Sequence, residues 1–170
     1  MMKKRVVAGI AVLTCLALHA RLVACEPENK PMSPVNQTLP LDNSQLMLGA
    51  VMNSETEEVR RLAERHQGLD ERDTGDQSTP MIAASDTDQW PVVEILIDHG
   101  ADIWAHDRFG TTTAQRTLTS RTLRGSPEDA ARLRVIEKLK ARGYPFPPPS
   151  RAEILALDTA RKWPPPGVKR

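Results

Sequence analysis

The sequence predicts an all-α protein built from stacked helix–turn–helix units, and three observations support this prediction. Apolar residues such as Val92, Ile95 and Leu96 recur at i, i+3 and i+4, the spacing of one helix face. The pattern restarts 33 residues later, from Thr79 to Thr112, which is a typical period of helical repeats. Helices this short cannot bury an apolar face alone, so neighbouring units must pack together.

The clearest unit begins at Thr79 and contains two helices. The Thr79 hydroxyl can cap the first helix, and Pro80 is tolerated in the first turn because its missing N–H would be unpaired there. Pro91 marks the start of the second helix in the same way. Gly100 follows it at the position where a left-handed residue ends a helix.

This unit resembles an ankyrin repeat. The resemblance is carried by Thr79-Pro80, by His-Gly-Ala-Asp at 99–102 and by Asp-Arg-Phe-Gly-Thr-Thr at 107–112, which suits a tight turn into the next unit. It implies an ankyrin-repeat solenoid over residues 42–162, with about three repeats and a C-terminal capping helix. It also implies a binding scaffold rather than an enzyme.

An upstream unit matches the pattern less well. We expect one short helix over 46–51, capped by Asn43 or Ser44, and a second over 55–66 that ends at Gly68. The Thr-Pro and Gly-Ala-Asp signatures are missing here. We therefore interpret this segment as a degenerate first repeat.

A third unit follows the clear one. Its first helix is expected over 114–123, and Ser126-Pro127 with acidic residues directly after it is a strong start for the second, which runs to about Arg142. Extra residues between the two predict longer helices or a protruding loop around 121–129. The inner edge of the second helix is expected at Leu133, Ile136 and Leu139.

The C-terminal part is rich in proline. Residues 145–149 predict an extended spacer. Ser150 and Glu153 form a capping box that begins a last helix, expected to run through Lys162. We expect a disordered Pro-rich tail over 163–170.

The N-terminus has the features of an export signal. A basic start is followed by a mostly apolar run over 6–18, too short for a stable membrane span but of the length of a signal-peptide core. Leu-Val-Ala-Cys at 22–25 resembles the lipobox of bacterial lipoproteins. The resemblance implies a signal peptide over 1–24, a lipidated Cys25 and a flexible tether over 25–41.

Two other outcomes of this signal stay open. Cleavage after Ala20 or Ala24 would give a soluble exported protein, and an uncleaved segment would act as an anchor. After lipidation the protein would sit in the periplasm, where Glu26 next to the lipidated residue favours the outer membrane by resemblance to enteric sorting. Removal of Cys15 with the signal would leave one cysteine, so no internal disulfide is expected.

Charge argues against nucleic acid as a partner. Removing residues 1–24 leaves 19 basic and 22 acidic residues, a net charge of −3. We expect partner contacts to come from a protein instead, and membrane contact to come from the N-terminal lipid.

The sequence contains no pattern typical of an active site. It has no Gly-rich phosphate loop, metalloprotease motif or nucleophile elbow. His99, Asp102, His106 and Asp107 lie close together, but the repeat assigns most of them to a helix end and a turn. We therefore predict no catalytic residue, no metal and no cofactor.

The candidate binding residues lie where an ankyrin-like stack contacts its partner, on the first helices and the tips between units. They are Trp90, Trp104, His106, Arg108 and Phe109. Trp and Arg are common anchors of protein interfaces. In the alternative interpretation Trp90 packs on Pro91 and Trp104 packs on the next repeat.

Two functions follow from these expectations. The first is a small monomeric, lipid-anchored scaffold that docks one envelope or secreted protein on its concave surface. The alternative is an immunity protein that neutralises a secreted toxin such as a phospholipase. The second rests on general resemblance and expected location, since a fold alone does not define a function.

Overall fold

The computed structural model describes residues 43–168 of the 170-residue chain. The expected signal peptide, the lipidation site at Cys25 and the tether over 25–41 lie outside the described residues. No helix in the described part is long and apolar enough to cross a membrane.

Seven helices and no strand make up residues 43–168, which confirms the predicted all-α class. The helices are α1 (Asn43–Met52), α2 (Thr56–Glu64), α3 (Pro80–Asp86), α4 (Trp90–Asp98), α5 (Thr113–Thr119), α6 (Pro127–Ala141) and α7 (Arg151–Thr159).

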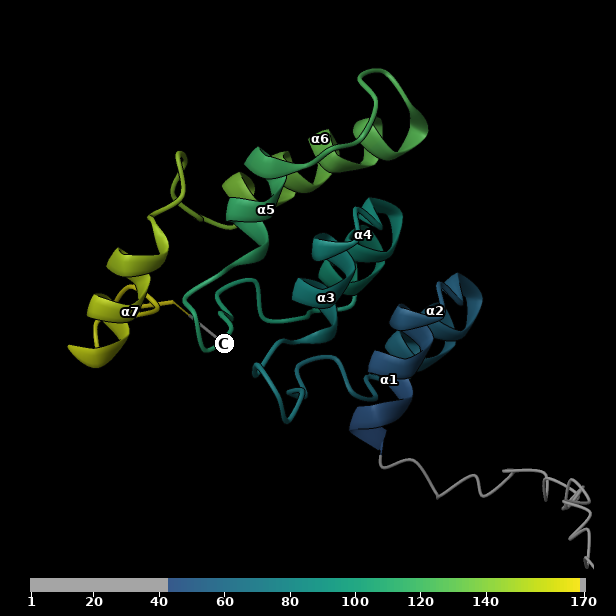
Figure 1. Cartoon of the computed structure of the whole chain (residues 1–170), viewed down its shortest axis with the longest axis horizontal. Helices are drawn as coiled ribbons and strands as arrows, with labels where there is room; N and C mark the ends of the chain where they lie inside the picture. Colours follow the sequence, from purple (N-terminus) through teal and green to yellow (C-terminus); the bar gives the residue numbers. More distant parts are fainter. Residues whose placement is uncertain (1–42, 169–170) are drawn as a thin grey trace, which may run out of the picture. The chain divides into compact units, whose positions relative to one another are not determined.

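The first six helices form three stacked pairs in two layers (Figure 1). One layer holds α1, α3 and α5, and the other holds α2, α4 and α6. Within each layer every helix contacts the next. Each pair thereby buries its apolar face against its neighbour, as helices of seven to fifteen residues require.

A continuous hydrophobic core runs through the stack. Leu96 on α4 is fully buried, as its place in the helical pattern predicts, and so are Val59 on α2 and Val135 on α6. The core extends from Met47 on α1 to Ile154 on α7. Because α4 contacts α2, α3 and α6, its side chains hold the centre of the core together.

The predicted starts of four helices are present, whereas α1 begins earlier than predicted and already contains Asn43 and Ser44, which were expected to cap it. Thr79 caps α3, and 33 residues later Thr112 caps α5, each accepting a backbone N–H on its side-chain oxygen. Ser126 caps α6 in the same way. Ser150 and Glu153 form the expected capping box at the start of α7. Local sequence therefore decides where these helices begin.

The end of α2 differs from the prediction. The residue with left-handed backbone directly after the helix is His66, with φ of 49°, and not Gly68. The N–H of His66 bonds to the carbonyl of Ala63, and the N–H of Gln67 bonds to that of Leu62. These bonds satisfy the last carbonyls of the helix before the chain reaches the glycine.

Two further helices end earlier than predicted. α5 ends at Thr119 rather than at 123, because Ser120 leaves helical geometry and its hydroxyl donates to Asp88 Oδ1 at 2.7 Å. α7 ends at Thr159 rather than Lys162. The short α5 leaves a loop before α6, which protrudes from the stack as expected (Figure 1).

The inner face of α6 was also predicted incorrectly in part. Leu133 is 51% exposed, whereas Ala131, Val135 and Leu139 are buried. These three are spaced at i, i+4 and i+8 on one face of α6, the helix that contacts α4 and α5. The helix therefore presents a different face to its neighbours than the prediction assumed.

The expected disordered tail begins with a packed residue. Trp163 is buried, and its Nε1 donates to the carbonyl of Trp104 at 2.8 Å. Its ring meets that of Trp104 edge-on at 5.4 Å and that of Tyr144 at 5.8 Å. The prediction of disorder from residue 163 onward is wrong at this position. It was based on the prolines that follow Trp163, and these do not indicate that its ring contacts aromatic residues far away in the sequence.

Candidate functional site

Asp107 binds the backbone at the tip of the loop between α4 and α5. One carboxylate oxygen of this buried residue accepts the N–H groups of Phe109 at 2.8 Å and Thr111 at 2.7 Å. Gly110 has a φ of 76°, and a Cβ there would lie 2.5 Å from the carbonyl oxygen of Arg151. The turn therefore requires both its Asp and its Gly.

Arg108 and Phe109 project from this tip. Phe109 is 51% exposed, and the guanidinium carbon of Arg108 lies 4.7 Å from the centre of its ring. The backbone N–H of Arg108 donates to the carbonyl of Asp76 in the preceding loop at 2.8 Å. An exposed aromatic ring and a cation are thus presented together on a fixed backbone.

His106 links the tip to α7. Its Nδ1 lies 2.7 Å from the carbonyl oxygen of Asp107, and its Nε2 lies 3.7 Å from Asp158 Oδ2 on α7. Its side chain is only 17% exposed. The residue lies beside the Arg108–Phe109 pair, but most of its surface is already in contact with the protein.

Trp90 does not reach the surface. It is the first residue of α4 and is fully buried. Its Nε1 donates to Asp88 Oδ1 at 3.0 Å and to Ser120 Oγ at 3.1 Å. The ring therefore ties the α3–α4 turn to the end of α5, and we leave it out of the candidate surface.

Trp104 is likewise buried. Its ring stacks on Tyr144 with centroids 4.8 Å apart, and Trp163 packs against both. Burial raises the pKa of the Tyr144 hydroxyl to about 12. Trp104 thus belongs to an aromatic cluster that joins the α4–α5 loop to the C-terminal segment, and it too is outside the candidate surface.

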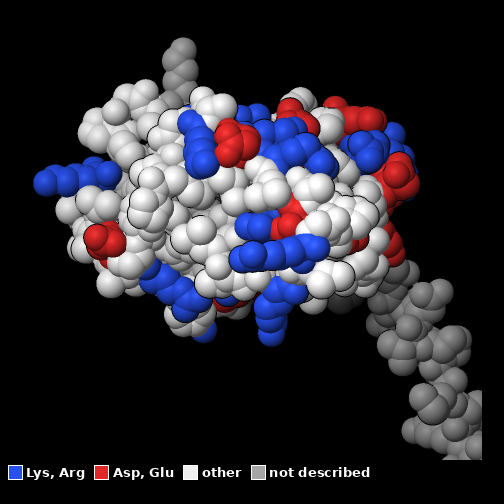
Figure 2. Space-filling view, turned by 90° about the horizontal axis from the view of Figure 1, so that it is seen from above, with Lys and Arg blue, Asp and Glu red and all other residues white. Residues whose placement is uncertain are grey.

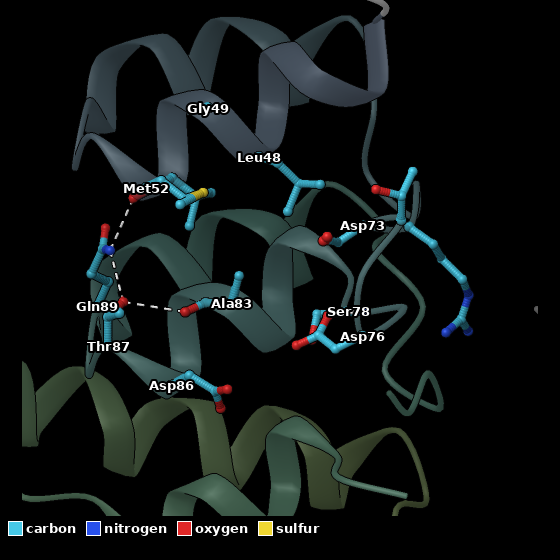
Figure 3. Close-up of a pocket in the computed structure, with 13 residues that line it drawn as sticks. Leu48, Gly49, Met52, Asp73, Asp76, Ser78, Ala83, Asp86, Thr87 and Gln89 are labelled. Atoms are coloured by element: carbon cyan, nitrogen blue, oxygen red, sulfur yellow. Dashed lines mark hydrogen bonds between the residues drawn. The ribbon is translucent and has the colours of Figure 1, made fainter. Parts of the chain in front are cut away.

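A groove between α1 and α3 was not predicted from the sequence (Figure 3). It has a volume of about 520 Å³ and continues to the loop residues 72–78. Leu48 and Met52 line it from α1, and Ala83 lines it from α3. The sequence feature that could have indicated the groove is the i, i+4 spacing of Leu48 and Met52 on α1. The same spacing is typical of a buried helix face, so it does not distinguish a groove from the core.

The loops at the edge of this groove and at the Arg108–Phe109 tip are joined. Arg72 Nη1 donates to the carbonyl of Gln77 at 2.8 Å within its own loop and to that of His106 in the next loop at 2.6 Å. The bond from Arg108 to Asp76 adds a second link. Groove and tip therefore lie on loops that are hydrogen-bonded to each other, and we define the two together as the loop face.

Two carboxylates with raised pKa values lie in structural contacts, and one of them, Asp86, also lines the groove. Burial raises the pKa of Asp70, which accepts the N–H of Asp102 at 2.6 Å, and that of Asp86, which binds Arg116 on the neighbouring α5. Across residues 43–168, no cluster of three or more His, Cys, Asp or Glu side chains could hold a metal ion.

Charges of both signs are interspersed on the face of the molecule shown in Figure 2. Ion pairs join α4 and α6: Arg134 on α6 binds Glu94 on α4 at 2.8 Å, and Lys138 on α6 binds Asp98 on α4 at 2.6 Å. A large part of this face carries no charged group (Figure 2).

No family model matches this sequence, and no curated protein matches it either.

Proposed function

We propose that this chain is a non-enzymatic protein-binding scaffold of the ankyrin-repeat type, and that one partner docks on the loop face. The exposed Arg108–Phe109 pair carries the proposal. A rigid tip that holds an aromatic ring and a guanidinium outward loses little conformational entropy on binding, and Arg and aromatic residues are common interface anchors.

The repeat type is supported by the spacing of the helix caps and by the two-layer stacking. Thr79 and Thr112 cap equivalent helices 33 residues apart. Asp73 and Asp107 occupy equivalent turns: each accepts the N–H of the second residue after it, and each donates its own N–H to the residue just before a cap. The same local geometry thus occurs in two successive units.

Partner capture tests the proposal. The detergent-solubilised protein is used as bait, and co-purifying proteins are identified by mass spectrometry. Binding of the captured partner is then measured for Arg108→Ala, Phe109→Ala and the control Arg60→Ala on α2. We expect at least one of the tip variants to weaken binding by about 1–2 kcal/mol, the scale of an interface anchor.

The control separates this surface from the rest of the molecule. Arg60 is an exposed Arg on the other helix layer, where it pairs with Glu57 of the same helix. If both tip variants bind like the wild type while Arg60→Ala weakens binding, the surface has been assigned to the wrong side. Melting curves on the same samples show whether each variant is folded.

We further propose that the mature protein is a lipoprotein that begins at Cys25, at the bacterial outer membrane. The lipobox-like sequence at 22–25 supports this. Cells that express the wild type or Cys25→Ser are grown with labelled palmitate and fractionated. Label in the membrane fraction that is lost in the variant is expected; an unlabelled wild type in the soluble periplasm would exclude lipidation.

A further inference from the structure

The groove between α1 and α3 has an apolar floor that the described residues, 43–168, leave open. Met52, at the end of α1, is 78% exposed, and Leu48 lies one turn earlier on the same helix face. Ala83 lines the opposite wall from α3. Gln89 Nε2 donates to the carbonyl of Val51 at 3.0 Å and connects the two walls at the Met52 end (Figure 3).

The other end of the groove is acidic. Asp73 and Asp76 line it from the loop, and both carboxylates are held in place by backbone N–H groups, at 3.0 Å from Gly75 and 2.8 Å from Ser78. The Ser78 N–H also lowers the pKa of Asp76 below its ordinary value, so this carboxylate is ionised at neutral pH.

The charges that line the groove are concentrated at its loop end. Asp73 and Asp76 lie there with one guanidinium, that of Arg72, whereas the third lining carboxylate, Asp86 on α3, is already paired with Arg116. The Arg72 guanidinium is bound to two backbone carbonyls. A ligand that matches this surface therefore has an apolar group beside a cation, since an anionic ligand would be repelled.

We propose that the groove binds a protein segment in which a large apolar side chain stands next to Lys or Arg. The apolar side chain packs against Leu48, Met52 and Ala83, and the cation lies beside Asp73 and Asp76. The groove volume of about 520 Å³ is within the range of sites that enclose small ligands, which leaves room for such a pair of side chains. This inference rests on the proposed scaffold function and names the chemistry of its partner.

Gly49 provides a direct way to block the groove. It lies on α1 between Leu48 and Met52 and lines the groove. A Cβ built on it meets no atom within 4 Å. The position therefore has room for a Cβ. We expect the ring of a tryptophan there to occupy the groove, whereas an alanine would make the same backbone change and leave the groove open.

The test uses the full chain in detergent as the target for a displayed library of short random peptides. We expect the selected peptides to share an apolar residue next to Lys or Arg. For one synthetic selected peptide, we expect Gly49→Trp to weaken binding at least about tenfold and Gly49→Ala to leave it within about twofold. Replacing Asp73 and Asp76 together by Asn keeps both turn acceptors and should weaken binding about fivefold.

Other outcomes would overturn the inference. These are selection of acidic peptides, selection of none, or a selected peptide that binds Gly49→Trp like the wild type. The last result leaves the scaffold function intact if Phe109→Ala weakens the same peptide, because the contact then lies at the tip. If a captured partner binds Gly49→Trp, Arg108→Ala and Phe109→Ala as tightly as it binds the wild type, the result counts against the scaffold function itself.

Discussion

Removing the side chain of Leu96 tests whether the stack is held by its central helix. Leu96 is fully buried on α4, which contacts helices on three sides. Leu96→Ala removes buried methyl groups and leaves a cavity that the surrounding helices fill only in part. Changes of this kind cost about 2–5 kcal/mol. A domain of this size has a free energy of unfolding of about 5–15 kcal/mol, so the loss is a large share of the total.

The same substitution at Leu133 is a matched control. Leu133 is 51% exposed on α6, and replacement by Ala there should change the free energy of unfolding by no more than about 0.5 kcal/mol. Both variants remove the same atoms from a helical leucine. The difference between them therefore measures burial in the core.

Urea unfolding followed by circular dichroism at the helix band gives both values. With a urea dependence of about 1–3 kcal/mol/M, a loss of about 3 kcal/mol lowers the midpoint by about 1–3 M. The central-core assignment is refuted if Leu96→Ala and Leu133→Ala shift the midpoint equally. It is also refuted if Leu133→Ala shifts it more.

Three further predictions concern single contacts. The ion pair with Arg134 holds the pKa of Glu94 below the ordinary value of 4.5, so its contribution to stability is complete above that pH and is lost as the pH falls through the lower, folded-state pKa. Glu94→Gln should therefore make the free energy of unfolding fall less steeply as the pH is lowered, and a pH dependence equal to that of the wild type would contradict this. Gly110→Ala should lower stability by more than about 1 kcal/mol, measured by urea unfolding, because the added Cβ meets the carbonyl of Arg151 at a positive φ. Trp163→Ala should lower the melting temperature through loss of about 3 kcal/mol of buried aromatic contact, and a melting curve like that of the wild type would show that the C-terminal segment is not part of the core.

Part of the candidate site was predictable because it depends on a turn. The sequence Asp-Arg-Phe-Gly at 107–110 places an acceptor, two projecting side chains and a left-handed residue in the order that a tight turn needs. The structure shows Arg108 and Phe109 exposed at that tip. These features are local, so neighbouring residues along the chain are enough to predict them.

The two tryptophans illustrate what local sequence does not decide. Trp90 and Trp104 lie at positions that also suit an interface, but contacts with distant segments bury both. Ser120 meets Trp90 across 30 positions, and Trp163 meets Trp104 across 59. Neither contact has a periodic signal, because each depends on where separate helices end.

The groove depends on packing for the same reason. Leu48 and Met52 have the spacing of a core face, and only the way α3 meets α1 leaves them open beside Asp73 and Asp76. The sequence pattern does not predict that the carboxylates of Asp73 and Asp76 line the same groove as Leu48 and Met52, because the two pairs are far apart along the chain.

The sequence by itself determined the helical class, the capped starts of α3, α5, α6 and α7, and the exposed turn at 107–110, because caps, prolines and glycines act within a few residues. Only the tertiary structure decided which apolar residues face the core and which stay at the surface. Leu133 and Met52 are exposed, whereas Trp163 in a proline-rich tail is buried. Burial is a property of neighbours brought together by the stack, and a helix with more than one apolar stripe can present any of them until its partners are in place.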